Sequence, residues 1–577
     1  MKLIKENITT LLLAVFVIAI ATIIYAPMYG YQEGMQIFMS GWDFFAEMSL
    51  RPGGLSDYAG CFLVQFFMYP AYIALILAAV VCGVQLSSKK IFLQQCPAPW
   101  ADFLSVVCAL GVVATLVYLN TVFGGVVAIL LALLAAAVCL RTQNIILLTI
   151  ATPVVYWIAG GWCCAIYVVA VTINNRKPVI TLAVNALALA FAVLITKKIM
   201  QDDSLWGTFV GVEYNRYDKV ANYSWFVAGA IVVASLLLSK INLKINRLIV
   251  QIPMYAVAAG ALVVWMAHIY DKGSMLDYKI DKMVRYKQWA RIVNTVTETY
   301  EQSYKSQRYY TSYQTQCYFN IALNELGILD SKMFNVMQIG TEGLASAVID
   351  NTDKSIYNSE IYFRLGLLNI AERLAVEAME SNDTHQKSAR QYKRLAEINI
   401  IRGDKPLAMR YIRKLQRTMF YSAWADRAEQ YINNPEQTEP LADWKIVPLE
   451  MQRDVFAAPA TKSDFFLHML FNNQHNKKVF NYYICELLLE KKIERIHDFL
   501  AQYRPDDELG THIYEALVLY SYRFNQEEFK KIMSNANDLT KRFQQFINFM
   551  NSADAQNPQK AKKLFGKTYW FYFFYCN

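Results

Sequence analysis

Long stretches without charge dominate the first half of the sequence. No Asp, Glu, Lys or Arg occurs in residues 58–88, 103–140, 142–175, 178–196, 220–239 and 248–270. A helix that spans a membrane needs about 20 apolar residues. The second and third stretches therefore predict two spans each, separated at 120–125 and at Gly160–Gly161. Together with the apolar run 9–29, the pattern predicts about nine membrane-spanning helices within residues 1–270.

The composition agrees with a membrane protein. The chain is 55% hydrophobic and 18% charged, whereas soluble proteins carry about 25% charged residues. The run 9–29 is too long for the apolar core of a signal peptide, and no small-residue cleavage site follows it, so we expect an uncleaved first span. The lipid bilayer is the first expected partner. No basic stripe with interleaved aromatic residues appears, so a nucleic-acid partner is not expected.

The positions of Lys and Arg predict the orientation, because positively charged loops stay in the cytoplasm. A cytoplasmic N-terminus places ten of them inside: Lys2, Lys5, Lys89, Lys90, Arg141, Arg176, Lys177, Lys240, Lys244 and Arg247. It leaves five outside: Arg51, Lys197, Lys198, Arg216 and Lys219. Nine spans then deliver residue 271 to the outside. We expect a bacterial inner membrane, with the second half of the chain in the periplasm. If 178–196 re-enters the membrane instead of crossing it, everything after it changes side.

Residues 271–577 show the pattern of paired amphipathic helices, so the whole chain is predicted to be all-α. Three segments place an aliphatic and a small residue three and four positions after a tyrosine: 318–322, 362–366 and 392–396. This pattern resembles the first helix of a tetratricopeptide repeat, and the third copy also has Gly403 and Ala408 where a helical hairpin needs them. We expect helical hairpins over 271–432, a proline-bearing linker over 433–460, and a second helical segment over 461–577. The aromatic run at 568–576 is expected to pack against its own chain.

Two connections in the membrane half are longer than the rest: 30–57 and 197–222. Both lie outside in the predicted topology. The first has the apolar pattern of short helices that lie in the membrane interface. Asp43 and Glu47 are four residues apart, so they share one helical face. At its end, Arg51-Pro52-Gly53-Gly54 predicts a turn, and Tyr69-Pro70 predicts a break in the helix that follows.

Two stretches carry a resemblance to a known family. RPGGLSDYAGCFLVQFFMYP at 51–70 and GKTYWFYFFYCN at 566–577 resemble an uncharacterised family of polytopic membrane proteins from Bacteroidota, described only as a domain of unknown function. The resemblance runs the length of the chain. It implies a Gram-negative inner membrane and supplies no catalytic residue.

The layout of the chain is also similar to that of the GT-C class of transferases, which move sugars from polyprenyl-phosphate donors. That resemblance implies that Asp43 or Glu47 acts as general base or metal ligand, with Asp202 and Asp203 as a second acidic pair. Arg51, Lys197 and Lys198 would bind the lipid phosphate. The competing interpretation is that these acids are solvated and that the lysines only mark the ends of spans. No cofactor motif is evident, and a divalent metal is expected only if the chain is a transferase.

Two functions remain open at this point, and with them whether the chain is an enzyme. In the first, the chain is a cell-envelope transferase whose helical repeats present the acceptor. In the second, the membrane half is a non-catalytic platform, and the helical repeats dock periplasmic protein partners. The large membrane half favours the first, because one span would anchor a scaffold. The absence of a catalytic motif favours the second.

Overall fold

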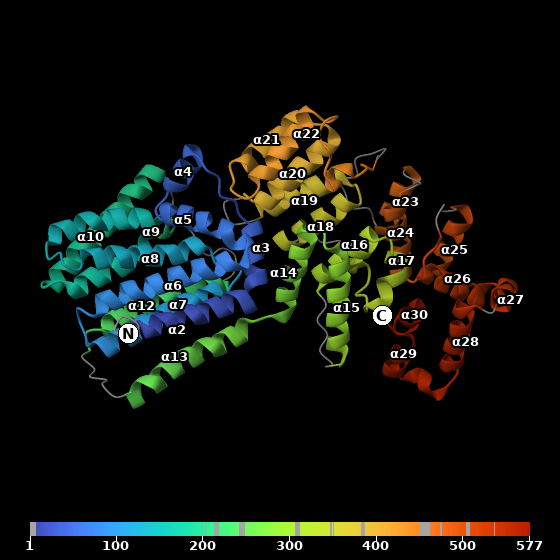
Figure 1. Ribbon diagram of the computed structural model, residues 1–577, viewed down its shortest axis with the longest axis horizontal. Coiled ribbons are helices and arrows are strands. Elements are labelled where there is room, and N and C mark those ends of the chain that lie inside the picture. The colour runs from blue at the N-terminus through green and yellow to red at the C-terminus, as the bar shows by residue number, and fades with distance from the viewer. Residues whose placement is uncertain are drawn as a thin grey trace. The chain divides into compact units, whose positions relative to one another are not determined.

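The computed structural model describes residues 7–201, 204–212, 219–241, 248–305, 312–346, 349, 351–381, 387–449, 462–472, 476–503, 508–535 and 537–576. All the elements assigned in these ranges are helices (Figure 1), which confirms the predicted all-α class. The chain forms two compact units. Unit 1 comprises Met1–Asp271, Asn382–Tyr392 and Ile412–Ala428, and unit 2 comprises Lys272–Ser381, Lys393–Tyr411 and Glu429–Asn577.

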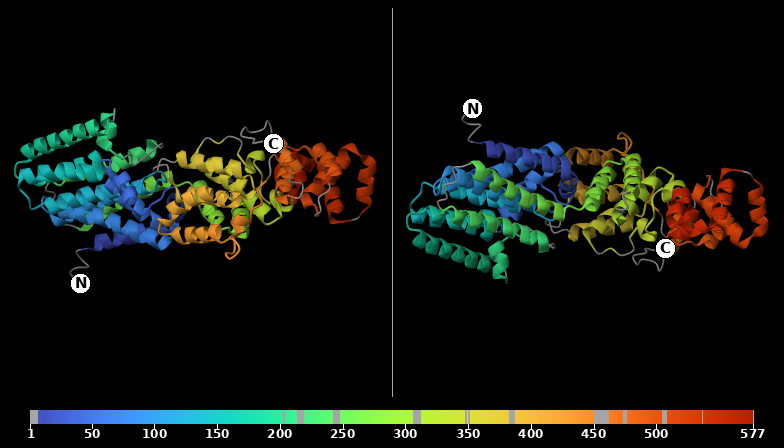
Figure 2. Two further views of the ribbon diagram at one scale, coloured as in Figure 1. Left: turned by 90° about the horizontal axis from the view of Figure 1, so that it is seen from above. Right: turned by 90° about the horizontal axis from the view of Figure 1, so that it is seen from below.

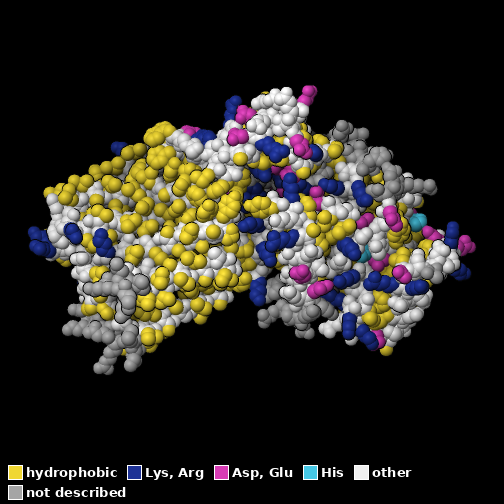
Figure 3. All heavy atoms as spheres, viewed as in Figure 1, with side chains coloured by type: hydrophobic (Ala, Val, Ile, Leu, Met, Phe, Trp, Pro, Cys, Tyr) yellow, Lys and Arg dark blue, Asp and Glu magenta, His cyan; other side chains and the backbone are white. Residues whose placement is uncertain are grey.

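Unit 1 is a bundle in which the helices coloured blue to teal lie alongside one another in every view (Figure 2). Its helices are α2 (Ile8–Ala19) with the π-helical η1 (Ile20–Ile24), α3 (Ala26–Gly34), α4 (Trp42–Ser49), α5 (Gly54–Val64) with the 3-10 turn η2 (Gln65–Met68), α6 (Pro70–Phe92), α7 (Ala98–Leu116), α8 (Phe123–Cys139), α9 (Ile145–Asn174), α10 (Pro178–Met200), α11 (Leu205–Val210), α12 (Lys219–Leu238) and α13 (Leu248–Ile269). Hydrophobic side chains cover the face of this unit seen in Figure 3, and Lys and Arg gather at its left end.

Five of these helices are long and apolar enough to cross a membrane: α6, α7, α9, α10 and residues Val250–Ile269 of α13. The helices Ile8–Ile24 and Ala26–Gly34, bent by 73°, make a sixth span if they are counted as one. Two shorter apolar helices, Phe123–Cys139 and Trp225–Leu238, lie among them. The chain is therefore a multi-pass membrane protein with five or six candidate spans by length. The sequence predicts about nine because it also counts short helices and separates the two arms of α9.

The helix α9 is a hairpin. Gly160 has φ 77° and ψ 168°, a conformation outside any helix, and Tyr167 Oη donates a hydrogen bond of 3.2 Å to the carbonyl of Leu148. In a continuous helix these two residues would lie about 28 Å apart at 1.5 Å per residue. At the open end, Gln143 Nε2 donates to the carbonyl of Asn174 at 3.3 Å. The chain reverses at Gly160, where the sequence predicts a break.

The predicted break at Tyr69-Pro70 is also present. Tyr69 is extended, with φ −117° and ψ 124°, and α6 begins at Pro70. Proline is tolerated at the first position of a helix because its missing N–H would have no partner there. The apolar stretch 58–88 therefore becomes α5, η2 and α6 instead of one continuous helix.

Polar contacts join several helices at one end of unit 1, here called the lysine-rich end. Asp102 pairs with Lys89 and accepts hydrogen bonds from Thr9 Oγ1 at 3.0 Å and from Tyr255 Oη at 2.8 Å. Lys240 Nζ donates to the carbonyl of Ile173 at 2.6 Å. Trp100 Nε1 donates to the carbonyl of Leu238 at 3.3 Å, which links the two groups of contacts. Parts of α2, α6, α7, α9, α12 and α13 therefore meet at this end.

The elements assigned in the described ranges of the second half of the chain are also helices. Its helices are α14 (Lys272–Arg285), α15 (Trp289–Lys305), α16 (Tyr313–Glu325), α17 (Leu329–Lys332), α18 (Thr352–Arg364), α19 (Leu368–Glu380), α20 (Ala389–Arg402), α21 (Lys405–Gln416), α22 (Ser422–Asn433), α23 (Lys462–Asn472), α24 (Lys477–Leu489), α25 (Ile493–Gln502), α26 (Thr511–Phe524), α27 (Gln526–Ser534), α28 (Asp538–Met550), α29 (Pro558–Phe565) and α30 (Tyr569–Tyr575). Within unit 2, α15 packs on α16, α18 on α19, α23 on α24 and α25 on α26.

The three tyrosine motifs fall on helices, with one local difference from the prediction. Tyr318 is buried in α16 and Tyr392 in α20. In the middle copy, however, Gly366 lies beyond the end of α18, with φ 85°, and Leu367 N–H donates to the carbonyl of Tyr362 at 2.8 Å. This is the glycine-capped end of a helix. The small residue therefore ends the helix here, where the repeat pattern predicts a close contact between helices.

The proline-bearing segment contributes a buried charge to unit 2. Asp443, in the 3-10 turn η5 (Ala442–Lys445), lies 2.5 Å from Arg364 Nη1 and 2.7 Å from Lys287 Nζ. Arg364 also pairs with Glu360 at 2.7 Å. Burial alone raises the pKa of Asp443, but Arg364 and Lys287 outweigh it and lower the pKa to about 2. These ion pairs fasten the segment to α18 and to the turn before α15.

The aromatic C-terminus packs against its own chain, as predicted. Tyr569 and Trp570 in α30 are completely buried. The backbone N–H of Tyr569 donates to Glu515 Oε2 at 2.7 Å, and Trp570 Nε1 donates to the carbonyl of Glu515 at 2.8 Å. The rings of Phe543 and Phe546 lie 4.9 Å and 5.8 Å from Trp570 between centroids. The last helix is thus part of the core of unit 2.

Candidate functional site

Three connections of unit 1 meet at the end of the bundle that carries the Gly160 turn, here called the loop end. The N–H of Gly53 donates to the carbonyl of Trp157 at 2.9 Å, and the N–H of Val212 donates to the carbonyl of Pro52 at 3.0 Å. Tyr156 Oη donates to the carbonyl of Thr208 at 2.6 Å. The described parts of the two long loops, 30–57 and 197–222, are therefore in direct contact.

Glycine allows this close approach. A Cβ on Gly160 would lie 2.6 Å from the carbonyl oxygen of Val210, and one on Gly211 would lie 2.1 Å from the carbonyl oxygen of Pro52. Both glycines also have φ 77°, which other residues adopt only with strain. Backbone contacts leave no room for a side chain at these two positions. Glycine is therefore needed there for the loops to come this close.

Asp43 and Glu47 share one face of α4, as predicted, and both are paired with cations. Arg417 binds Asp43 with two contacts, Nη1 to Oδ2 at 2.8 Å and Nη2 to Oδ1 at 2.5 Å. Its Nε also donates to the carbonyl of Ser40 at 2.8 Å. Lys387 forms an ion pair with Glu47. Both cations come from the parts of unit 1 that follow residue 381 in the sequence.

The pairing changes what these acids can do. The hydrogen bonds from Arg417 lower the pKa of the Asp43 carboxyl. A carboxylate with a lowered pKa is a weaker base, because removing a proton from an acceptor becomes less favourable. The geometry of Asp43 therefore favours a structural ion pair between two segments of unit 1 over a role as general base.

The remaining candidates are spread over two other segments. Arg51 is exposed, just beyond α4, while Lys197 is half-buried and Lys198 exposed in the last turn of α10. In the part of the chain that the structure describes, neither Asp43 nor Glu47 pairs with any of these three cations. Asp202 and Asp203 lie outside the described residues.

Two buried acids at this end were not among the predicted site residues. Glu33 in α3 is 3% exposed and accepts a hydrogen bond of 3.0 Å from Tyr421 Oη. Asp57 in α5 is completely buried, and a Cβ on Gly124 would lie 2.9 Å from its Oδ1. The burial of Asp57 depends on its contact with the distant Gly124, which no local sequence pattern reveals. The Gly53-Gly54 pair before Asp57 was the only local signal.

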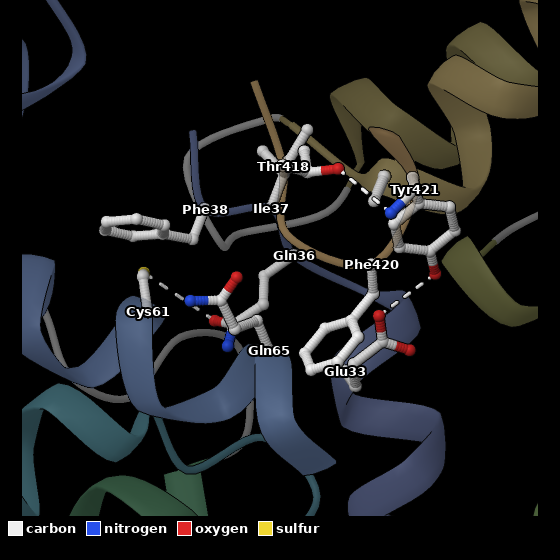
Figure 4. Close-up of a pocket in the computed structure, with 10 residues that line it drawn as sticks. Glu33, Gln36, Ile37, Phe38, Cys61, Gln65, Thr418, Phe420 and Tyr421 are labelled. Atoms are coloured by element: carbon white, nitrogen blue, oxygen red, sulfur yellow. Dashed lines mark hydrogen bonds between the residues drawn. The ribbon is translucent and has the colours of Figure 1, made fainter. Parts of the chain in front are cut away.

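Glu33 lines a small cavity in unit 1 (Figure 4). Gln36 lines it from the loop after α3, Cys61 from α5 and Gln65 from η2, and Thr418, Phe420 and Tyr421 line it from the segment between α21 and α22. The Nε2 atoms of Gln36 and Gln65 are buried and make no hydrogen bond within the described residues. The cavity has room for about one water molecule. Two amide donors and a carboxylate suit a water molecule, and the cavity is too small for a sugar.

A metal site of three or more His, Cys, Asp or Glu side chains does not occur within the described ranges. A carboxylate pair in a transferase would bind a divalent cation through oxygen ligands. In this structure the acids of α4 are instead satisfied by nitrogen cations.

Comparison with known proteins gives a single assignment. No curated protein matches the chain, and no solved structure matches it. A family of unknown function, DUF6057, matches residues 2–576. That match covers nearly the whole length, including the stretches 51–70 and 566–577. The chain belongs to this family.

Proposed function

We propose that the chain is a multi-pass protein of a bacterial inner membrane that carries a periplasmic helical domain and uses that domain to dock envelope proteins. The pairing of Asp43 with Arg417 and of Glu47 with Lys387 is the observation that carries this proposal. Both acids of the first long loop are paired with cations from later parts of unit 1, while Asp43 stays 73% and Glu47 59% exposed. A structural platform needs ion pairs between its segments, whereas a catalytic base has to be free to accept a proton.

The proposed topology has nine crossings, with the lysine-rich end in the cytoplasm. The contacts of α13 support an odd number. Tyr255, near its start, binds Asp102 at the lysine-rich end, whereas Tyr270, just after it, packs on Tyr25 with ring centroids 6.0 Å apart. A count by helix length alone gives five or six crossings. The proposal reaches nine because it counts the two arms of the α9 hairpin separately and adds the shorter helices α8 and α12. Lys89 and Lys240 at one end agree with the retention of positive charge in the cytoplasm.

The proposed docking domain consists of tetratricopeptide-like hairpins. The best copy is α20 with α21: Gly403 ends α20 with φ 76°, and Ala408, Ile412 and Leu415 of α21 are completely buried. Stacked hairpins of this kind present a concave face on which protein segments bind. The expected partner is therefore a periplasmic protein.

A transferase remains a second candidate because the two long loops meet at the loop end, where a lipid-linked donor would have to bind. In that case a polyprenyl-phosphate donor would meet Arg51, Lys197 or Lys198. Asp43, Glu47, Asp202 or Asp203 would supply the base or hold a divalent metal. The buried Asp57 adds a further carboxylate to this end.

Charge reversal separates the two candidates. Asp43→Arg and Arg417→Asp each place like charges together, so we expect each single variant to reduce complementation of a deletion strain. The double variant restores an ion pair with the opposite polarity, and a platform should regain function. A catalytic Asp43 could not be replaced by Arg under any pairing, so a double variant as defective as Asp43→Arg would contradict the platform.

The matched second pair is Glu47 with Lys387, which should behave in the same way. Alanine replacements of Asp202 and Asp203 complete the test. If the charge reversals are rescued and both alanine variants complement fully, none of the four predicted acids Asp43, Glu47, Asp202 and Asp203 is the catalytic base. Protease resistance of each variant, measured in membranes, distinguishes loss of function from loss of folding.

A further inference from the structure

Exposed aromatic side chains surround the start of α6. Tyr69 and Tyr72 are each 46% exposed, and Leu75, one turn further along α6, is 61% exposed. Because α6 is a candidate span, this exposed side is its lipid-facing stripe. Tyrosine is enriched where a span meets the headgroup layer. The two tyrosines therefore mark the level of the membrane interface on this helix.

The loop 417–421, which joins α21 to α22, lies at the same level. The ring of Phe420 packs edge-on against Tyr69 and Phe66, with centroids 5.7 Å and 5.6 Å apart. Its neighbour Met419 is 53% exposed. All of these residues belong to unit 1. The half-buried ring of Phe420 thus joins the exposed Met419 to the aromatic side chains at the start of α6.

The polar part of the same loop faces α4. Arg417 is held by Asp43 and by the carbonyl of Ser40, and Trp42, next to Asp43, is 77% exposed. A cation followed by large apolar side chains is the arrangement of segments that lie in the interface, where charges stay among the headgroups and apolar groups reach the acyl chains.

We propose that loop 417–421 inserts Met419 and Phe420 into the interfacial layer of the bilayer, beside Tyr69 and Tyr72. The loop 417–421 would then contact lipid as well as α4. Lipid is the expected occupant because the exposed surface continues the stripe of a candidate span. The inference needs unit 1 to be embedded in a membrane, but it holds whichever compartment the loop faces and whether or not the chain docks proteins.

Quenching by brominated lipid tests this inference. A cysteine in place of Met419 carries a fluorescent label, and the full chain is placed in nanodiscs that contain phospholipid brominated near the headgroup. We expect the label to lose most of its emission, as it should for Tyr72→Cys in the proposed rim. Arg413→Cys, on an exposed position of α21, should keep its emission. The unsubstituted chain gives the background from native cysteines.

Aqueous iodide distinguishes the other occupants. Quenching of the Met419→Cys label by iodide and not by brominated lipid would mean that the loop faces water, which overturns the proposal. Protection from both quenchers would mean that another protein or a second copy of the chain covers the loop, which overturns it as well. Quenching by brominated lipid alone supports it.

Discussion

Single residues in unit 2 show how buried charge fixes an irregular segment. Asp443→Asn would leave Arg364 and Lys287 without their carboxylate, while Arg364 stays 7% exposed. Breaking a buried ion pair costs about 3 to 5 kcal/mol. We expect the variant to lower the unfolding temperature of the full-length protein in detergent. Asp554→Asn is the control, because its pair with Lys560 is half-exposed and should be worth less than about 1 kcal/mol.

The same residue predicts a dependence on pH. The pKa of Asp443 is about 2 in the folded chain and about 3.9 in an unfolded one. Its contribution is therefore complete above the unfolded value and disappears as the pH falls through the folded value. Wild type and Asp443→Asn should converge in stability between about pH 4 and pH 2. A gap that stays constant over this range would contradict the role of the charge.

Residue types were predicted better than residue partners. The shared face of Asp43 and Glu47 follows from a spacing of four residues. Their cations, however, lie 374 and 340 positions away in the sequence, and the Tyr421 partner of Glu33 lies 388 positions away. Local periodicity contains no information at such separations. The suggestion that Asp43 or Glu47 acts as general base or metal ligand was therefore made without knowledge of the cations that pair with them.

At the scale of elements, the Gly160 turn decides the course of the chain. Gly160→Ala would place a Cβ 2.6 Å from the Val210 carbonyl at φ 77°. A residue other than glycine in this region costs about 1 to 3 kcal/mol, and the close contact adds to that cost. We expect a clear fall in thermal stability in detergent. Gly260→Ala, in α13 with open space around it, should leave stability unchanged or raise it by up to about 1 kcal/mol.

Breaks in the helices were the most predictable elements, because glycine and proline act locally. The turn at Gly160 and the break at Tyr69-Pro70 appear where the sequence places them. Gly366 shows the limit of such reasoning. In the repeat pattern a small residue means a close helix contact, yet the same residue with positive φ ends a helix. Only the backbone conformation distinguishes the two roles.

For the whole molecule, the side of the membrane on which the second half lies depends on α10. Lys177 precedes this helix and Lys198 lies in its last turn, and both are exposed. At 1.5 Å per residue its 23 residues reach about 34 Å, enough for a hydrocarbon core of about 30 Å. In intact spheroplasts, an impermeant maleimide should therefore label Lys198→Cys and leave Lys177→Cys unlabelled until the cells are lysed.

The exposed Lys541 extends the test to unit 2, since nine crossings put Lys541→Cys on the same side as Lys198→Cys. If α10 re-enters the membrane, Lys177→Cys and Lys198→Cys will label alike, and the parity of every later crossing will change. Two lysines at the end of α10 are typical of a cytoplasmic boundary, so this pair, taken by itself, argues against the proposed side. The hairpin of α9 argues for it, because it returns the chain to the lysine-rich end just before α10 begins. We therefore expect α10, which is long enough to cross, to finish at the other face.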